Sequence, residues 1–127
     1  MTKRILIAED DNIIALDIRK YLEKKGYNIS DVVCKGEELL SAARRLKPAL
    51  IISDINLKGE LDGIEAIARL SENISIPYIF VTAYDDYKRV VEIYNLEPLA
   101  FIKKPINYDE LSDCVSKSFT SNLSYNS

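Results

Sequence analysis

The stretch Ile5-Leu6-Ile7-Ala8-Glu9-Asp10-Asp11 gives the strongest indication of the fold. Four consecutive apolar residues lead directly into three acids. A continuous apolar run of this length is typical of a parallel strand that is covered on both faces. Because the acids follow the run directly, we expect them at the carboxyl end of that strand.

Four further apolar runs follow along the chain, at residues 29–34, 49–53, 78–82 and 99–102. Of these, the run at 29–34 is interrupted by Ser30 and Asp31, and we predict it to be an edge strand. Between and after the runs, apolar residues recur at the spacings of amphipathic helices. These residues are Ile14, Ile18, Tyr21 and Leu22; Leu39, Ala43 and Leu46; Ile64, Ile67 and Ala68; Tyr87, Val90, Val91 and Tyr94; and Leu111, Val115 and Phe119.

The ends of these helices carry local signals. Gly26 is predicted to end the first helix and Pro48 to close the second. Asp62 is a candidate N-cap for the third helix. The last helix is expected to start at Asn107, with Glu110 at the spacing of a capping box.

A strand followed by a helix, repeated five times, predicts an α/β domain with a doubly wound parallel sheet. The length of 127 residues fits a single domain. For five strands we expect the flavodoxin-like order 2-1-3-4-5, in which ligands bind beyond the carboxyl ends of strands one and three. We predict that the domain covers residues 1–120 and that a polar C-terminal tail covers 121–127.

The composition excludes several classes of protein. Histidine is absent, which excludes Ser-His-Asp and Cys-His catalysis, imidazole zinc sites and a histidine-borne phosphate on this chain. The net charge of -3 argues against a nucleic-acid partner. Two cysteines, Cys34 and Cys114, are too few for a disulfide framework. No apolar stretch approaches the ~20 residues of a membrane span or the ~7–15 of a signal sequence, so we expect a cytoplasmic protein without a membrane partner.

Acidic residues follow two of the predicted strands that should be neighbours. Glu9 and Asp10 come after the first strand, and Asp54 comes after the third. Ionised carboxylates at close quarters repel one another and need a positive charge nearby. Oxygen ligands without His or Cys suit a hard cation, and we therefore predict Mg²⁺, with Mn²⁺ as its substitute. The alternative is that the acids only cap the first helix, which Asp11 or Asn12 would do in any case.

The other strand ends add a hydroxyl and an ammonium group. Thr82 closes the fourth strand, and Lys103 and Lys104 follow the fifth. A carboxylate such as that of Asp54 can act as a nucleophile and become an aspartyl-phosphate. A metal and Lys104 would neutralise the phosphoryl oxygens, and Thr82 would donate a hydrogen bond to one of them. This set of residues predicts a phosphoryl pocket at Asp54.

Two lysines compete for the ammonium position in this pocket. Successive side chains point to opposite sides of a strand, so only one of Lys103 and Lys104 should enter the site. Lys104 precedes Pro105, and a cis bond between them would be a deliberate feature, since about 5–6% of X–Pro bonds in folded proteins are cis. The spacing alone leaves both lysines open.

Together and in this order, the motifs resemble the response-regulator receiver domains of two-component signalling, of the chemotaxis type. The resemblance covers residues from Lys3 to about Phe119. It implies that Glu9 and Asp10 are the acidic pair of the metal site. Asp54 matches the phosphoacceptor of the family.

Four further positions match the pattern of these receiver domains. Asn56 matches the residue whose main-chain carbonyl binds the metal. Lys104, directly before the proline, matches the invariant lysine, which favours it over Lys103. Thr82 matches the switch hydroxyl and Phe101 the aromatic switch position. On phosphorylation, Thr82 would move toward the new oxygens and the ring of Phe101 would turn inward.

The resemblance also implies a function. A histidine kinase or a histidine phosphotransfer domain would supply the phosphoryl group to Asp54, and the change in conformation would signal to an output partner. Such a receiver catalyses its own phosphorylation and dephosphorylation and is not otherwise an enzyme. Asn56 and Tyr84 match positions that influence the lifetime of the aspartyl-phosphate, and the bulky Tyr84 predicts slow dephosphorylation.

The sequence departs from many family members in the loop after the third strand. Lys58 stands where many of them have a proline, and one residue is added before the Asp62-Gly63 pair. Gly59 is expected to accommodate this added residue.

Partner surfaces and rival functions remain open at this point. Ile13 is the best exposed candidate for docking on a kinase, and a phosphorylation-dependent homodimer would use the fourth helix and fifth strand. One rival is a receiver-like interaction module that works without phosphorylation. Another is a small aspartate-based phosphohydrolase, which is disfavoured because Asn56 stands where such enzymes carry a second acid. A flavin-binding protein is disfavoured because the acids after the first strand would repel the cofactor phosphate.

Overall fold

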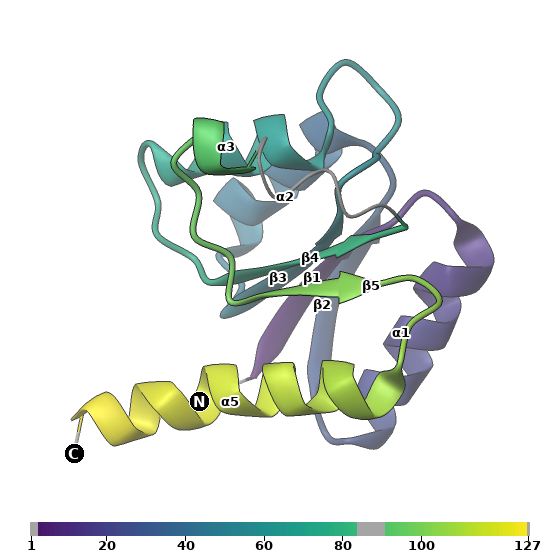
Figure 1. Ribbon diagram of the computed structural model, residues 1–127, viewed down its shortest axis with the longest axis vertical. Helices are drawn as coiled ribbons and strands as arrows, with labels where there is room; N and C mark the ends of the chain where they lie inside the picture. The colour runs from purple at the N-terminus through teal and green to yellow at the C-terminus, as the bar shows by residue number, and fades with distance from the viewer. Residues whose placement is uncertain (1–2, 84–90, 127) are drawn as a thin grey trace.

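The structure, a computed structural model, describes residues 3–83 and 91–126, with side chains as far as residue 120 (Figure 1). Residues 91–93 are helical and belong to the fourth predicted helix, whose Tyr87 and Val90 lie outside the described residues. The named elements, in chain order, are β1 (Arg4–Ala8), α1 (Asn12–Lys24), β2 (Asn28–Val33), α2 (Gly36–Leu46), β3 (Leu50–Asp54), α3 (Gly63–Ser71), β4 (Tyr78–Thr82), β5 (Ala100–Lys103) and α5 (Tyr108–Asn126).

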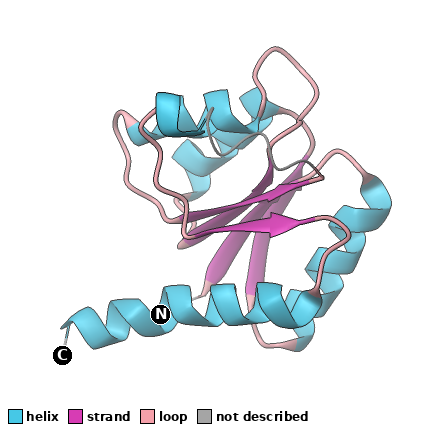
Figure 2. Ribbon diagram, in the orientation of Figure 1, coloured by secondary structure: helices cyan, strands magenta, loops and turns pink. Residues whose placement is uncertain are grey.

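The five strands form one parallel sheet in the order β2-β1-β3-β4-β5 (Figure 2). This order confirms the predicted doubly wound sheet, and β2 lies at an edge as its polar sequence predicted. The first strand lies between two strands that come later in the chain, so the direction of winding reverses beside it. The carboxyl ends of β1 and β3 therefore form the crevice in which such folds bind ligands.

The helices cover both faces of the sheet and bury two separate cores. Helices α2 and α3 lie on one face, and α1 and α5 lie on the other (Figure 1). Leu6, Ile51 and Phe80 pack beneath α2 and α3, whereas Ile7 and Ile52 pack beneath α1 and α5. Because successive strand residues alternate between two buried faces, each strand appears in the sequence as a continuous apolar run.

Side chains cap the helices as the sequence predicted. Asp11 Oδ1 accepts hydrogen bonds from the backbone N–H groups two and three residues on, at 2.9 and 3.2 Å. Asp62 and Asn107 each accept one from the N–H three residues on, at 2.8 and 3.1 Å. These bonds satisfy donors that have no partner inside the first turn of a helix.

The last helix continues into the segment that the sequence analysis assigned to a polar tail. Helix α5 runs from Tyr108 to Asn126 and thus includes most of residues 121–127. The division of the chain after residue 120 stays a prediction. Within the described ranges, no helix combines the length and the hydropathy needed to cross a membrane.

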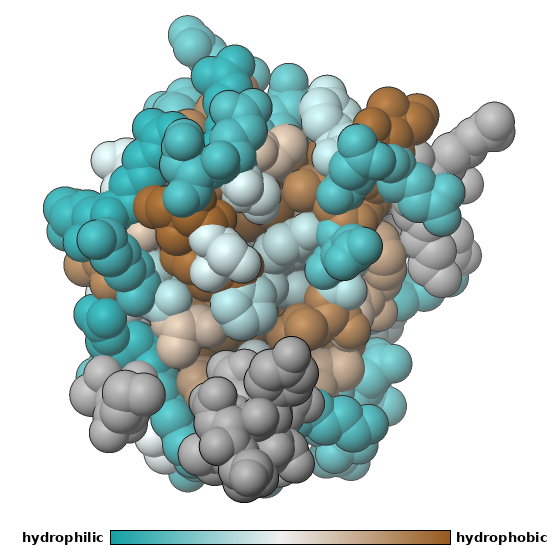
Figure 3. Space-filling model, turned by 90° about the vertical axis from the view of Figure 1, so that its left-hand side faces the viewer, coloured by the Kyte–Doolittle hydropathy of each residue, from teal (hydrophilic) through white to brown (hydrophobic). Residues whose placement is uncertain are grey.

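A cleft of 630 Å³ lies at the end of the molecule where β4 and β5 begin. Ile74, Pro77, Tyr78, Asn95 and Leu96 contribute to its lining. Figure 3 views the molecule from the side where the strands begin and shows apolar side chains at the surface among hydrophilic ones. This cleft is at the opposite end of the sheet from the acidic residues.

Candidate phosphoacceptor site

Three carboxyl groups meet at the carboxyl ends of β1 and β3. Glu9 follows β1, Asp54 is the last residue of β3, and these strands pair directly with Ala8 opposite Ser53. One oxygen each of Glu9, Asp10 and Asp54 lies within 4.8 Å of the other two. Glu9 and Asp54 are 3% and 5% exposed, and Asp10 is half-buried. The fold therefore brings together the three acids that the sequence placed at neighbouring strand ends.

The ammonium group of Lys104 bridges two of these carboxylates. Its Nζ donates a hydrogen bond to Asp54 Oδ2 at 2.9 Å and lies 2.8 Å from Glu9 Oε1. The Lys104 side chain is 17% exposed, whereas Lys103, the last residue of β5, is an exposed residue. Lys104 is therefore the lysine that contacts the acids. The peptide bond between Lys104 and Pro105 is cis.

Burial and charge together raise two pKa values at the site. Burial raises the pKa of Glu9 to about 7, although the Lys104 ammonium and the backbone N–H of Asp11 oppose this rise. Burial by itself would lower the pKa of Lys104, but its bonds to Glu9 and Asp54 outweigh that effect, so the pKa of Lys104 is raised. Near neutral pH, Lys104 is thus charged, and Glu9 titrates when no cation is bound.

The donor atoms suit a divalent cation. Glu9, Asp10 and Asp54 offer carboxylate oxygens, which are the ligands that Mg²⁺ and Mn²⁺ prefer. The buried Glu9 Oε1 is paired in charge with Lys104 at 2.8 Å but accepts no hydrogen bond of standard geometry. A carboxylate has about four acceptor sites, so Glu9 can bind a cation in addition to its contacts with Lys104 and the N–H of Asp11.

The loop after β3 folds back onto Asp54. The backbone N–H of Asn56 donates to Asp54 Oδ1 at 3.1 Å, so the main chain of Asn56 lies beside the carboxylate, although the residue itself is exposed. Gly63, the first residue of α3, donates from its N–H to the carbonyl of Ile55 at 2.9 Å. A Cβ at Gly63 would overlap with the Asp54 carbonyl oxygen, so the close approach of α3 to β3 requires glycine.

Thr82 and Phe101 lie on β4 and β5, beyond β3 in the sheet. Thr82 ends β4 and is 5% exposed, and its carbonyl accepts the backbone N–H of Lys104 at 2.8 Å. Phe101 lies opposite Phe80 in the β4–β5 register, with the ring centroids 6.1 Å apart. Thr82 is therefore at the rim with the acids, while Phe101 is partly buried and packs against the core that α2 and α3 cover. Tyr84 lies outside the described residues.

One contact close to the site was not predicted from the sequence. The carboxylate of Glu37, in α2, accepts hydrogen bonds from the backbone N–H groups of Glu60 and Leu61 in the loop between β3 and α3. The partners are 23 and 24 positions away, so no local spacing indicates the contact. The sequence had indicated only that this loop carries one added residue and that Gly59 accommodates it, and Gly59 has a φ of 101°.

Comparisons with known proteins agree with this geometry. A family model described as the response regulator receiver domain matches residues 5–116. The chain is 31% identical over 120 residues to the sporulation initiation phosphotransferase F of Bacillus subtilis, covering 92% of this chain and 94% of that protein. It is 32% identical over 118 residues to the phyllosphere-induced regulator PhyR of Methylorubrum extorquens, covering 92% of this chain and 43% of that protein.

A solved structure of a receiver domain is also similar to this chain. The signal receiver domain of a modulated diguanylate cyclase from Desulfovibrio desulfuricans G20 matches with a TM-score of 0.84 at 32% identity, over 95% of this chain and 96% of that one. Several curated relatives are longer, and the chain spans 53% of the transcriptional regulatory protein PdtaR of Mycobacterium tuberculosis. With its sheet order, its strand-end acids and a match over most of its length, the chain belongs to the family of response regulator receiver domains, the phosphorelay receivers of two-component systems.

Proposed function

We propose that the domain accepts a phosphoryl group on Asp54 from a phosphorylated histidine of a kinase or phosphotransfer protein, in a reaction that requires Mg²⁺ or Mn²⁺. This proposal rests on the position of Asp54. Its carboxylate lies among the acidic oxygens of Glu9 and Asp10 and 2.9 Å from Lys104 Nζ. A carboxylate that attacks a negatively charged phosphoryl group needs positive charge around it, because phosphoryl transfer depends on positioning and charge neutralisation. Lys104 supplies one positive charge, and a cation bound by the acids would supply the rest.

In the proposed reaction, a carboxylate oxygen of Asp54 attacks the phosphorus atom. The bond from phosphorus to the donor nitrogen breaks, and its electron pair stays on the imidazole of the donor. Lys104 neutralises one phosphoryl oxygen, and the hydroxyl of Thr82 donates a hydrogen bond to another. Glu9, Asp10, Asp54 and the main-chain carbonyl of Asn56 would hold a divalent cation, which when bound would supply Lewis-acid neutralisation of phosphoryl charge.

The proposed response begins with the change in charge. Phosphorylation gives Asp54 a group of about -2 charge with three strong acceptor oxygens. Thr82 moves toward these oxygens, and the ring of Phe101 turns inward to fill the space behind it. Because Phe101 has no hydroxyl, its inward position depends on packing, and Phe80 in the neighbouring strand is part of that packing. The surface around β5 then differs between the two states, which is what an output partner recognises.

Two positions beside the site are proposed to set the lifetime of the aspartyl-phosphate. Asn56 is exposed next to the Asp54 carboxylate. Tyr84, which lies outside the described residues, offers no carboxylate or amide to orient a water molecule, so slow dephosphorylation is expected. A Tyr84→Glu variant should therefore change the decay rate, and an unchanged rate would contradict this role.

The proposed partners follow from the family and from exposed apolar side chains. Ile13 and Leu16 are 74% and 49% exposed in α1, which begins two residues after Asp10, and we assign them to docking of the histidine-bearing partner. In the fourth helical segment, Val91 is buried as predicted, whereas Tyr94 is 45% exposed, which differs from the predicted core position. The surface around Tyr94 and β5 would form the phosphorylation-dependent homodimer. We also propose that the protein is cytoplasmic and that it binds neither nucleic acid nor a membrane.

Intact-mass spectrometry with acetyl phosphate tests this function. The wild type should gain the mass of one phosphoryl group when Mg²⁺ is present, and Asp54→Ala should not. Asp17→Ala, at an exposed aspartate of α1, is the matched control and should be labelled like the wild type. No adduct on the wild type, under conditions that label a known receiver, would favour the phosphorylation-independent interaction module. Turnover of small phosphate esters would favour the phosphohydrolase.

A further inference from the structure

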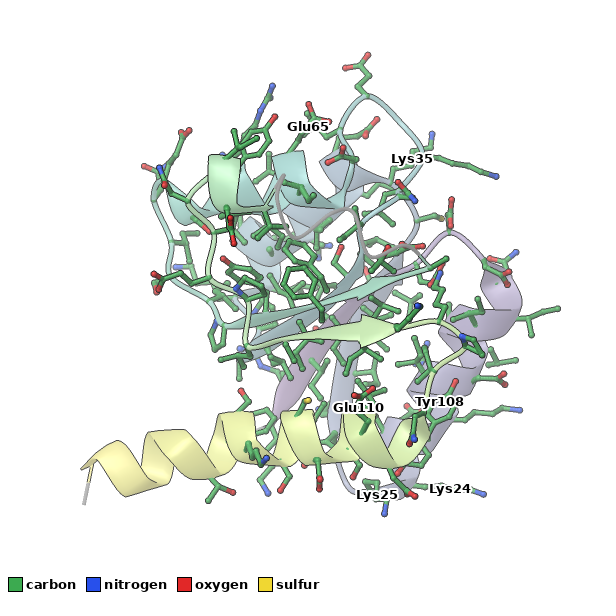
Figure 4. All side chains as sticks on the ribbon, viewed as in Figure 1. Lys24, Lys25, Lys35, Glu65, Tyr108 and Glu110 are labelled. Atoms are coloured by element: carbon green, nitrogen blue, oxygen red, sulfur yellow. The ribbon has the colours of Figure 1, made fainter. Side chains whose placement is uncertain are left out.

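The loop between β3 and α3, residues 55–62, is held against the start of α2. It is the teal loop at the upper right of Figure 1. Lys58 forms an isolated parallel bridge with Lys35, and the N–H of Gly36 donates to the Lys58 carbonyl at 3.4 Å. The Lys35 side chain points away from the body of the molecule (Figure 4), so the main chain makes this contact. Two apolar residues of the loop, Leu57 and Leu61, are buried in the core beneath α2 and α3.

The carboxylate of Glu37 completes the attachment of the loop. Both of its oxygens accept the backbone N–H of Glu60, at 3.2 and 3.3 Å, and Oε1 also accepts that of Leu61 at 3.5 Å. Hydrogen bonds from its own backbone N–H and from that of Glu60 lower the pKa of the Glu37 carboxyl. The group is thus ionised at neutral pH, and a charged acceptor holds a main chain that is otherwise exposed at residues 58–60.

Glycine residues on both sides allow this close contact. Gly59 has a φ of 101°, and a Cβ there would overlap with the Glu37 carboxylate. Gly36, at the start of α2, faces the loop so closely that a Cβ would overlap with the carbonyl of Leu61. The added residue of the loop therefore does not protrude freely, because α2 offers a fitted surface for it.

The attached loop contains the main chain that lies beside Asp54. Asn56 N–H binds Asp54 Oδ1 at 3.1 Å, and the α2 contacts begin at Lys58, two residues further on. At the other end, Gly63 N–H binds the Ile55 carbonyl at 2.9 Å. Contacts on both sides of Asn56 therefore restrain its main chain. Among these contacts, the hydrogen bonds to the Glu37 carboxylate are the ones made by a charged group.

We infer that Glu37 is a positioning residue for the phosphoacceptor site. By holding the loop, it keeps the main chain of Asn56 beside Asp54, and it thereby sets the affinity for the cation and the lifetime of the phosphoryl group. This inference rests on the proposed function of Asp54. It assigns a role in the reaction to an α2 residue whose own carboxylate takes no part in the chemistry.

The experiment compares substitutions at two neighbouring acids of α2. Glu37→Ala removes the loop contact, and Glu37→Gln keeps one acceptor oxygen. Glu38→Ala is the matched control, since the Glu38 carboxylate accepts the N–H groups of Cys34 and Lys35 and none in the loop. The Mg²⁺ dissociation constant is measured by isothermal titration calorimetry, and the half-life of the acetyl-phosphate-derived adduct by intact mass. Urea unfolding checks that each variant is folded.

Glu37→Ala should raise the Mg²⁺ dissociation constant about tenfold, in the range found for groups that orient a metal ligand from outside. It should also change the adduct half-life, Glu37→Gln should restore most of both values, and Glu38→Ala should match the wild type. Equal constants and half-lives in Glu37→Ala and the wild type would overturn the inference. So would an equal effect of Glu38→Ala, which would point to general loosening of α2. If the wild type binds Mg²⁺ but is never phosphorylated, the proposed function fails, and the Mg²⁺ titration still decides the role of Glu37.

Discussion

Lys104 Nζ lies 2.9 Å from Asp54 Oδ2, although the two residues are 50 positions apart in the sequence. The same ammonium group lies 2.8 Å from Glu9 Oε1, so one positive charge is shared by two buried carboxylates. Removing one partner of such a group leaves charge in a poorly solvated place, which costs more than the pair contributes to stability. Lys104 therefore stabilises the site before any phosphoryl group arrives, in addition to its proposed role in the reaction.

Substitution of Lys104 should affect both stability and phosphorylation. Lys104→Met leaves Glu9 and Asp54 without their counter-charge, and the unfolding free energy at pH 7 should fall by about 2 kcal/mol, below the value for fully buried pairs since the lysine is partly solvated. The rate of labelling by acetyl phosphate should fall about 100-fold. Lys103→Met, at the exposed lysine one position earlier, should leave the labelling rate unchanged. Similar losses in both variants, by urea unfolding and intact mass, would contradict the assignment of Lys104.

The pKa of about 7 for Glu9 predicts a pH dependence of the cation-free protein. The ordinary value is 4.5, so between pH 4.5 and about 7 the folded state binds more protons at Glu9 than the unfolded state does. Stability from this group is therefore present at low pH and is lost as the pH rises through the folded-state pKa. The loss from pH 4.5 to pH 8 should amount to about 3 kcal/mol at most.

Urea unfolding in EDTA at pH 5 and pH 8 measures this effect. Glu9→Gln should be more stable than the wild type at pH 8 and close to it at pH 5. Glu23→Gln, at an exposed glutamate of α1, should keep the wild-type slope. Added Mg²⁺ should restore the wild type at pH 8, because a cation favours ionised Glu9. Parallel pH profiles for the wild type and Glu9→Gln would show that Glu9 does not titrate in this range.

Gly63 should be needed for the geometry of β3 at Asp54. A Cβ in Gly63→Ala would overlap with the Asp54 carbonyl, so β3 or α3 must shift, at a cost of about 1–3 kcal/mol in unfolding free energy. The rate at which acetyl phosphate labels Asp54 should also fall in this variant. Gly26→Ala is the control, since its Cβ meets no atom within 4 Å and its cost of about 1 kcal/mol comes from a left-handed φ alone. That variant should be labelled at the wild-type rate, and equal labelling of Gly63→Ala would argue against the close approach.

The proposed movement of Phe101 has a direct spectroscopic test. In the unphosphorylated protein, the rings of Phe80 and Phe101 have centroids 6.1 Å apart and should give nuclear Overhauser contacts. Acetyl phosphate with Mg²⁺ should change the Phe101 contacts and its side-chain rotamer. Asp54→Ala under the same conditions should keep the original spectrum. An unchanged Phe101 rotamer in a fully phosphorylated sample would leave Phe101 as a static residue of β5.

Much of the fold could be predicted because the relevant patterns are local. Each strand coincides with an apolar run, and each predicted cap that the structure describes is made by the expected side chain. The carboxyl ends of three strands differ by one residue, since β3 includes Asp54, β5 includes Lys103, and β2 stops at Val33, one residue before the predicted end. Backbone pairing determines where a strand ends, whereas the apolar pattern reports burial only.

The site itself was partly predictable because parallel strands bring their carboxyl ends to one edge. That rule places Glu9 and Asp54 near one of the two lysines after the fifth strand, and the family resemblance favoured Lys104 over Lys103. The rule does not give the double ion pair of Lys104, the glycine requirement at Gly63 or the loop contact of Glu37. These contacts depend on distances between elements that are remote in sequence, and packing of the complete fold sets those distances.

The lysine of the site follows β5, a strand of four residues at the edge of the sheet. Edge elements open locally at a lower free energy than the centre of a fold does. A separation of β5 from β4 would remove Lys104 from Glu9 and Asp54, whereas β1, β3 and β4 pair without β5. If Asp54 accepts a phosphoryl group as proposed, the reactive fraction of molecules should follow the fraction in which β5 is paired with β4. A ligand or partner that clamps the margin of the sheet would raise the phosphorylation rate without touching the acidic crevice.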